Sequence, residues 1–223
     1  MCSENHNWNL KEELFSEKEM YRKIENFCET GDYPQTSLAL SFMRDSHEGQ
    51  YRKPVWFSDK KVPYIQHPLL MACHALALGL CKDDMLAAIL LHDVCEDCCV
   101  APYQLPVGKT VQELVELLTF QVPEGMSKQA AKRQYYERIQ TNPEAAMIKV
   151  IDRCNNVSTM AASFSRKKLE SYVEETEEYI YPLMECIPHQ CKEYQNALLV
   201  LKYHILSVTE TIKNMLLRDR RER

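Results

Sequence analysis

The segment Leu86–Asp97 carries the side chains best suited to chemistry. It begins as an apolar run and ends in two polar pairs, His92 with Asp93 and then Glu96 with Asp97. If the helix continues, its 3.6-residue turn places His92 above Glu96. The same spacing places Asp93 above Asp97. Carboxylates crowded in a low dielectric repel one another, and a divalent metal is an economical counterion for them.

An alternative explanation is that this segment is a helix end that turns to solvent, where acidic residues are common. Two observations weigh against it. Acidic residues at the C-terminus of a helix oppose the helix dipole, and the preceding run is strongly apolar, which indicates depth. We therefore favour a ligand role for the four polar side chains, with the solvated helix end as the open alternative.

Two further positions fit the same chemistry. His67 lies at the start of a predicted helix, and Asp152 interrupts an apolar helical pattern, with Asn156 one turn later on the same face. Taken singly, His67 can be a packed or exposed histidine, and Asp152 can make a buried contact with an arginine or asparagine. A mixed set of imidazoles and carboxylates suits Mn²⁺, Fe²⁺ or Zn²⁺ better than Ca²⁺ or Mg²⁺. The set consists of His67, His92, Asp93 and Asp152.

The elements that must position these groups are predicted to be helices. The 223 residues include only 5 glycines, and no segment alternates with period two for long, so the predicted class is all-α. Apolar periodicity and end signals predict helices over 10–29, 34–47, 64–80, 85–95, 111–118, 127–141, 143–151, 165–187 and 190–217.

Composition narrows the function classes. The net charge of −5 disfavours a broadly basic nucleic-acid-binding surface but leaves room for a local basic pocket. No apolar run approaches the roughly 18–20 residues of a membrane span. The polar, acidic start of the chain, residues 1–13, does not resemble a signal peptide. We therefore expect a cytoplasmic protein without a membrane or nucleic-acid partner, and the sequence carries no signal of oligomeric state.

The 10 cysteines do not read as a disulfide framework. Most lie within apolar helical patterns, where a reduced thiol acts as a small hydrophobic side chain. Cys95, Cys98 and Cys99 form a C-x-x-C-C cluster, but no second ligand pair at zinc spacing follows it. A structural zinc site at this cluster is therefore disfavoured.

Five phrases of the sequence, in this order, resemble the HD phosphohydrolase superfamily. The closer resemblance is to the ppGpp hydrolase domain of RelA/SpoT-type enzymes and their stand-alone small relatives. A bare His-Asp pair is a weak signal, whereas HD-x-x-ED together with Y-I-x-H-P and D-R-x-x-N is specific. The resemblance covers roughly residues 36–187. Its phrases are Gln50–Lys53, Tyr64–Pro68, Leu90–Asp97, Lys149–Asn156 and Glu175–Leu183.

The resemblance implies a fold and a division of the chain. We expect an HD-domain helical bundle of about eight to ten helices. The expected units are an N-terminal helical extension over 1–30, an HD-type metal-dependent phosphohydrolase domain over 31–187, and a C-terminal helix with a basic tail over 188–223. The synthetase domain of the bifunctional enzymes is not expected here.

The resemblance also implies roles for the matching positions. Glu96 and Asp97 would position and activate an attacking water. Arg52 and Lys53 would lie over the base and phosphates of a nucleotide, and Asn156 would contact its nucleoside. One Mn²⁺, with Fe²⁺ or Zn²⁺ as alternatives, would be held by His67, His92, Asp93 and Asp152.

The implied reaction removes pyrophosphate from the 3′ position of ppGpp or pppGpp and gives GDP or GTP. Two departures from the family fall near the substrate: a longer loop that adds Trp56 and Phe57, and Ser158 where arginine is usual. They leave two alternatives open. One is a phosphatase or pyrophosphohydrolase acting on another nucleotide, such as NADPH, and the other is a non-catalytic nucleotide-binding module. The expected partner in each case is a small nucleotide.

Overall fold

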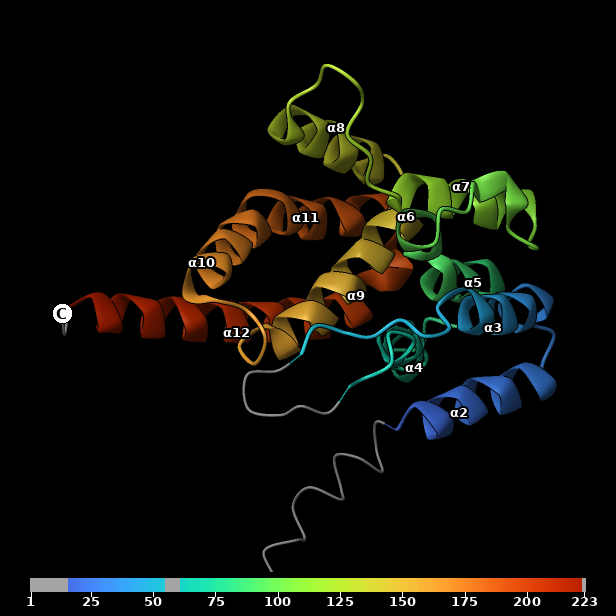
Figure 1. The fold of residues 1–223 in the computed structure, drawn as a ribbon. Helices are drawn as coiled ribbons and strands as arrows, with labels where there is room; N and C mark the ends of the chain where they lie inside the picture. The colour runs from blue at the N-terminus through green and yellow to red at the C-terminus, as the bar shows by residue number, and fades with distance from the viewer. Residues whose placement is uncertain (1–15, 55–60, 222–223) are drawn as a thin grey trace, which may run out of the picture.

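Four helices form the N-terminal side of the molecule (Figure 1). In the computed structural model, which describes residues 16–54 and 61–221, they are α2 (Glu17–Glu29), α3 (Pro34–Ser46), α4 (Gln66–Ala77) and α5 (Asp83–Leu91). Helix α5 packs against both α3 and α4, and α2 packs against the same two helices. Because every residue from Met85 to Leu91 is buried, α5 is the core helix of this side.

The remaining helices complete the bundle. Helices α7 and α8 lie in the upper part of Figure 1, and the long α12 extends to the left, where the C-terminus is marked. Among the described residues, no helix is long and apolar enough to cross a bilayer. The elements after α5 are α6 (Val94–Asp97), η1 (Pro102–Gln104), α7 (Lys109–Leu118), α8 (Lys128–Gln140), α9 (Pro143–Met160), α10 (Arg166–Glu175), the π-helical turn η2 (Thr176–Ile180), α11 (Tyr181–Gln190), η3 (Lys192–Tyr194) and α12 (Gln195–Arg221).

Helix α9 runs through the centre and joins the two sides (Figure 1). It packs against α4, α5, α7, α8, α11 and α12. The side chain of Asn142 fixes where it begins, because its Oδ1 accepts the N–H groups of Glu144 at 2.9 Å and Ala145 at 3.0 Å. Pro143 occupies the first turn, where a missing N–H costs nothing. Twelve of its 18 residues are buried, so the polar side chains it carries inward need partners.

The all-α prediction is confirmed. The only bridge between extended segments in the described part of the chain pairs Tyr51 with Pro63. The predicted helix over 10–29 is seen from Glu17 onward, and its first residues lie outside the described ones, as do Trp56 and Phe57. The division into units over 1–30, 31–187 and 188–223 stays a prediction.

The prediction of one continuous helix over 85–95 is wrong. Helix α5 ends at Leu91, and α6 starts at Val94, with His92 and Asp93 in a turn between them. The Nδ1 of His92 lies 2.8 Å from the carbonyl oxygen of Ile89 and takes its hydrogen bond. In a regular helix the N–H of Asp93 would use that carbonyl. The side chain of His92 thus competes with the helix at the point where the chemistry is expected.

One carboxylate ties α3 to α5. Asp83, the first residue of α5, accepts the N–H groups of Gln35 at 2.9 Å and Thr36 at 2.8 Å, and the Thr36 hydroxyl at 2.7 Å. These N–H groups begin α3, whose own preceding residue, Tyr33, provides no side-chain cap. Asp83 therefore acts as the N-terminal cap of a helix that is 47 residues away in sequence.

Replacement of Asp83 by alanine leaves two helix N–H groups without this acceptor. We expect Asp83→Ala to lower the free energy of unfolding by about 2 kcal/mol, measured by urea denaturation. Asp84→Ala, in the same helical turn, is the matched control and should change stability by no more than about 0.5 kcal/mol. Equal losses in the two variants would show that the link between α3 and α5 does not depend on Asp83.

Candidate active site

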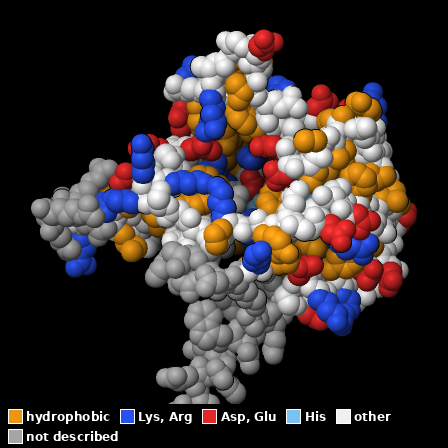
Figure 2. Space-filling model, viewed as in Figure 1, with side chains coloured by type: hydrophobic (Ala, Val, Ile, Leu, Met, Phe, Trp, Pro, Cys, Tyr) orange, Lys and Arg blue, Asp and Glu red, His pale blue; other side chains and the backbone are white. Residues whose placement is uncertain are grey.

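A cavity of about 550 Å³ opens on the face of the molecule shown in Figure 2. Its walls come from residues 51–53 and 62–64, from α4, from Asp93 and Glu96 after α5, and from α8, α9 and α10. One face of α9 supplies much of the lining, because residues spaced by three and four positions point the same way. These lining residues of α9 are Lys149, Asp152, Arg153, Asn155, Asn156 and Thr159.

Three of the predicted metal ligands meet at one end of this cavity. One ligand atom each of His67, His92 and Asp93 lies within 4.8 Å of the other two. The Oδ2 of Asp93 is 2.9 Å from the Nε2 of His92 and 3.9 Å from the Nε2 of His67. The two imidazole rings lie edge to face, with their centroids 5.2 Å apart and an angle of 66° between their planes. Histidines from α4 and from the end of α5 are thus brought together from positions 25 residues apart.

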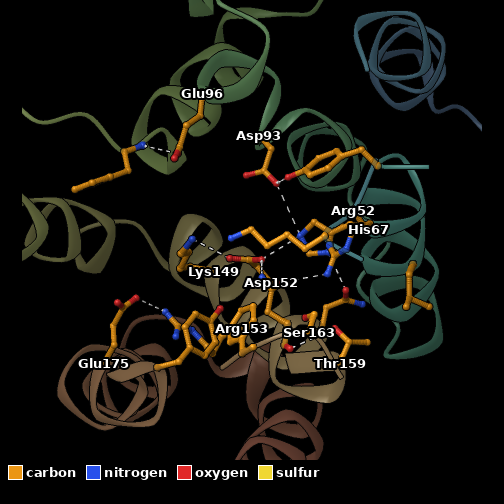
Figure 3. Close-up of a pocket in the computed structure, with 18 of the residues that line it drawn as sticks. Arg52, His67, Asp93, Glu96, Lys149, Asp152, Arg153, Thr159, Ser163 and Glu175 are labelled. Carbon is orange, nitrogen blue, oxygen red and sulfur yellow. Dashed lines mark hydrogen bonds and ion pairs between the residues drawn. The ribbon is translucent and has the colours of Figure 1, made fainter. Parts of the chain in front are cut away.

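The fourth predicted ligand, Asp152, lies beside this cluster. Its Oδ1 is 3.2 Å from the Nε2 of His67, and Figure 3 shows Asp152 between Lys149 and His67. The carboxylate also accepts the Nζ of Lys149 at 2.8 Å and the amide of Asn156 at 2.5 Å. All four residues of the predicted set therefore converge, although Asp152 shares its oxygens with two other partners.

The two imidazoles are oriented by bonds to their far sides, and the Asp93 carboxylate by a bond to the oxygen that faces them. The Nδ1 of His67 pairs with the Oδ1 of Asn155 at 2.8 Å, and the Nδ1 of His92 pairs with the carbonyl of Ile89. The Tyr64 hydroxyl donates to the Oδ2 of Asp93 at 2.5 Å. Such outer partners fix the tautomer of a metal-binding histidine and leave its Nε2 lone pair free.

The Nε2 of His92 supports a metal in this position. The side chain is almost fully buried, and its Nε2 has no hydrogen-bond partner among the described residues, while the Oδ2 of Asp93 lies 2.9 Å away as an ion-pair contact. A buried polar atom without a partner is rare in folded proteins and calls for an explanation. A divalent ion between the imidazoles and carboxylates would satisfy this atom. The donor set therefore fits a transition metal.

The charges of the cluster are mutually supporting. Although burial disfavours the imidazolium, the Asp93 carboxylate raises the pKa of His92 to about 9. Burial alone would raise the pKa of Asp93, yet His92 and then His67 hold it below its usual value. Burial likewise opposes ionisation of Asp152, but Lys149 holds the pKa of Asp152 well below its usual range. A metal must displace the proton of His92, so metal binding should weaken as the pH falls.

The two acids predicted to activate water are placed differently. Glu96 lines the cavity, and its Oε2 accepts the backbone N–H of Phe120 at 3.3 Å. Burial, followed by the charge of Asp93, raises the pKa of Glu96 although the Phe120 N–H lowers it. Asp97 does not line the cavity, and its carboxylate instead faces the Tyr64 hydroxyl. The turn at His92 and Asp93 thus brings only the first of the two acids to the cavity wall.

The predicted nucleotide-binding residues all line the cavity. Arg52 donates to the Oδ1 of Asn156 at 3.4 Å, and the bond from the Arg52 N–H to the Val62 carbonyl holds its backbone. Lys53 follows at the rim. Among the basic residues of α8, Lys132 also reaches this cavity.

The site also contains residues that sequence analysis did not assign to it. The buried Arg153 donates to the Oε1 of Glu175 at 2.6 Å and lies 4.0 Å over the ring of Tyr172. Lys132 reaches the second oxygen of Glu175 at 2.5 Å. Figure 3 shows this group at the side of the cavity away from Asp93. The family phrases contain Arg153 and Glu175, but nothing in their spacing predicts that the two side chains pair.

Comparison with known proteins gives relatives that are named mostly as guanosine-3′,5′-bis(diphosphate) 3′-pyrophosphohydrolases. No family model matches the sequence. The bifunctional (p)ppGpp synthase/hydrolase SpoT of Escherichia coli K12 is 34% identical over 169 residues, which is 72% of this chain and 23% of that protein. The guanosine-3′,5′-bis(diphosphate) 3′-pyrophosphohydrolase of Aquifex aeolicus is 31% identical over 160 residues, 68% of this chain and 22% of that protein. The chain thus spans less than a quarter of the length of these relatives.

A solved structure shares the fold. It is described as a metazoan orthologue of SpoT that hydrolyses ppGpp and plays a role in starvation responses. The TM-score is 0.61 at 19% sequence identity, and the match covers 80% of this chain and 95% of the other. The helical bundle around the cavity is therefore a known architecture.

The bond from Tyr64 to Asp93 gives a direct test of how the cluster is held. We expect Tyr64→Phe to weaken the binding of Mn²⁺ about tenfold, since loss of an outer partner typically costs ten- to a hundredfold in metal affinity. Isothermal titration calorimetry measures the change. Tyr135→Phe is the matched control, because this hydroxyl lines the same cavity but donates to the Leu118 carbonyl at 2.6 Å. Equal affinity in both variants would contradict an orienting role for Tyr64.

Proposed function

We propose that this chain, which is homologous over about 70% of its length to ppGpp 3′-pyrophosphohydrolases of the SpoT type, is itself a metal-dependent hydrolase of guanosine alarmones. In this proposal ppGpp gives GDP and pyrophosphate, and pppGpp gives GTP and pyrophosphate. The unit that acts is the HD-type domain over 31–187, flanked by the N-terminal extension over 1–30 and the C-terminal segment over 188–223.

The observation that carries the proposal is the position of the imidazole and carboxylate cluster at one end of a largely cationic cavity. Six lysine and arginine side chains and four acidic side chains line this cavity, while the whole chain has a net charge of −5. A concentration of positive charge in a cleft of an acidic protein favours a polyanionic ligand. A nucleotide with several phosphates is such a ligand, and its size suits a cavity of about 550 Å³.

The proposed metal is Mn²⁺, with Fe²⁺ or Zn²⁺ as alternatives of similar ligand preference. Once bound, the ion would lower the pKa of water and neutralise negative charge that develops on the phosphate. Its proposed ligands are His67, His92, Asp93 and Asp152. Asn155 supports the first of these ligands from behind, and Tyr64 donates to the Oδ2 of the third.

Glu96 is the proposed general base. The water oxygen attacks the phosphorus that is bonded to the 3′ oxygen. The bond from this phosphorus to the 3′ oxygen then breaks. Glu96 takes the proton of the water, pyrophosphate departs, and the 3′ oxygen regains a proton from solvent. Because the pKa of Glu96 is raised, turnover should decline as the pH falls through that raised value. Asp97 acts in this scheme only through Tyr64, as a positioning residue.

Substrate contacts are proposed for three further residues that line the cavity. Arg52 and Lys53 would lie over the base and phosphates, and Asn156 would contact the nucleoside. The bond between Arg52 and Asn156 joins the two walls at this level. Both side chains are half-buried, so they offer their remaining polar atoms to a ligand in the cavity.

The choice of substrate is tested by product analysis. Purified protein with Mn²⁺ should release pyrophosphate and GDP from ppGpp, and treatment with a chelator followed by buffer exchange should abolish this release until Mn²⁺ is restored. NADPH is the control substrate. Release of orthophosphate from NADPH, with ppGpp left intact, would show that the substrate is another nucleotide and not an alarmone. Absence of activity on both compounds would favour a non-catalytic nucleotide-binding module.

The roles of the acids are separated by paired substitutions. We expect Asp93→Ala to lose the metal and all turnover. Glu96→Gln should keep the metal and lower the turnover of ppGpp by about a hundredfold or more, the usual share of a general base. Elemental analysis and a pyrophosphate assay give the two readouts. Glu116→Gln, at an exposed position on α7, is the control and should match the unmodified protein. Turnover unchanged by Glu96→Gln would refute the assignment of the base.

A further inference from the structure

The carboxylate of Glu96 is held from another element, the segment that follows α7. Because Glu96 lines an open cavity, packing alone does not fix the direction of its side chain. Among the residues that the structure describes, the one hydrogen bond to this carboxylate comes from the N–H of Phe120, 3.3 Å from Oε2. Figure 3 shows this bond on the side of Glu96 away from Asp93. The direction of Glu96 therefore depends on where the Phe120 peptide lies.

Phe120 lies just beyond the last turn of α7. The helix ends at Leu118, and Thr119 has an extended backbone, with φ −78° and ψ 117°. The last carbonyl groups of a helix have no partner within it, so they need bonds from elsewhere. Thr119 is fixed by the helix itself, since its N–H at 2.9 Å and its hydroxyl at 2.7 Å both donate to the Val115 carbonyl. The carbonyl of Leu118 is left for another element to bind.

Tyr135 of α8 contacts both neighbours of Thr119. Its hydroxyl donates to the Leu118 carbonyl at 2.6 Å. Its ring lies edge to face with the ring of Phe120, with the centroids 5.4 Å apart. Burial, above all, raises the pKa of Tyr135, so the hydroxyl keeps its proton and remains a donor. One buried side chain thus fixes the residue before Thr119 and the residue after it.

The ring of Tyr135 also faces the proposed metal ligands. The Nζ of Lys149 lies 5.7 Å from the ring centroid, and the same Nζ donates to Asp152 at 2.8 Å. The ring therefore supports a cation that pairs with a proposed ligand, while the hydroxyl supports the end of α7. Removal of the hydroxyl alone separates the second contact from the first.

We infer that Tyr135 is a positioning residue for the general base: its hydroxyl fixes the end of α7, so that the Phe120 N–H holds the Glu96 carboxylate toward the cavity. This inference rests on the proposed function, in which Glu96 takes the proton of the attacking water. Without the hydroxyl, Leu118 and Phe120 can shift, and Glu96 adopts orientations that do not reach the water. The bonds of the metal ligands do not change.

The first test is the kinetics of Tyr135→Phe, which keeps the ring and its contacts with Phe120 and Lys149. We expect kcat for ppGpp to fall about tenfold and KM to stay within about twofold, since a displaced catalytic group slows the reaction and leaves substrate binding intact. The Phe120 N–H lowers the pKa of Glu96, so a weaker bond raises this pKa. The acidic limb of the pH profile of kcat should therefore move to higher pH.

Tyr194→Phe is the matched control. Tyr194 is also buried, its hydroxyl donates to the Oε1 of Glu144 at 3.3 Å, and it does not line the cavity. This variant loses a buried hydroxyl as well, but it should keep the kcat and the pH profile of the unmodified chain. Unchanged kcat in Tyr135→Phe, or the same fall in both variants, would overturn the positioning role.

A second readout does not require turnover. Labelling of the 6 phenylalanines with ¹⁵N gives few enough amide signals to follow Phe120 by NMR, with Zn²⁺ as a diamagnetic ion in place of Mn²⁺. The Phe120 signal should shift as Glu96 titrates in the unmodified chain, and this shift should shrink in Tyr135→Phe. Shifts of equal size would contradict the inference. Inactivity of the unmodified chain toward ppGpp would instead remove the proposed reaction and leave this measurement valid.

Discussion

The structure depends on bringing two imidazoles and two carboxylates to one buried point. They arrive on three different stretches of chain: His67 on α4, His92 and Asp93 at the break between α5 and α6, and Asp152 on α9. Burying such groups is unfavourable unless each has a partner. The bonds to Asn155 and Ile89 supply partners on the outer sides of the two imidazoles, so the Nε2 of His92, which makes no hydrogen bond among the described residues, is directed to the inner one.

The same constraint explains the central helix. Helix α9 must be buried to reach the cluster, yet it carries Lys149, Asp152 and Arg153 on its cavity face. Burial opposes every one of these charges, and the ion pairs of Asp152 with Lys149 and of Arg153 with Glu175 keep them ionised. A cavity whose interior acids are neutralised in this way leaves its rim positive, as the lysine and arginine side chains around the hollow in Figure 2 illustrate.

The sequence predicted the convergence but not its details. Asp152 stood out because a carboxylate interrupts an apolar helix, and His92 with Asp93 stood out because they end one. Periodicity assumes that a helix continues, so it missed the turn that His92 causes by bonding to Ile89. Adjacent helical residues point about 100° apart, so two neighbouring acids do not both face one cavity. After the turn, Glu96 faces the cavity and Asp97 does not line it. Contacts between distant elements, such as Arg153 with Glu175, leave no local signal.

The most direct measurement is a crystal structure of the chain with Mn²⁺, in which anomalous scattering locates the ion. The account predicts one strong peak per chain, between the Nε2 atoms of His67 and His92 and within bonding distance of Asp93 and Asp152. No peak there, or a peak at Cys95, Cys98 and Cys99 instead, would contradict the claim that the buried cluster is a metal centre.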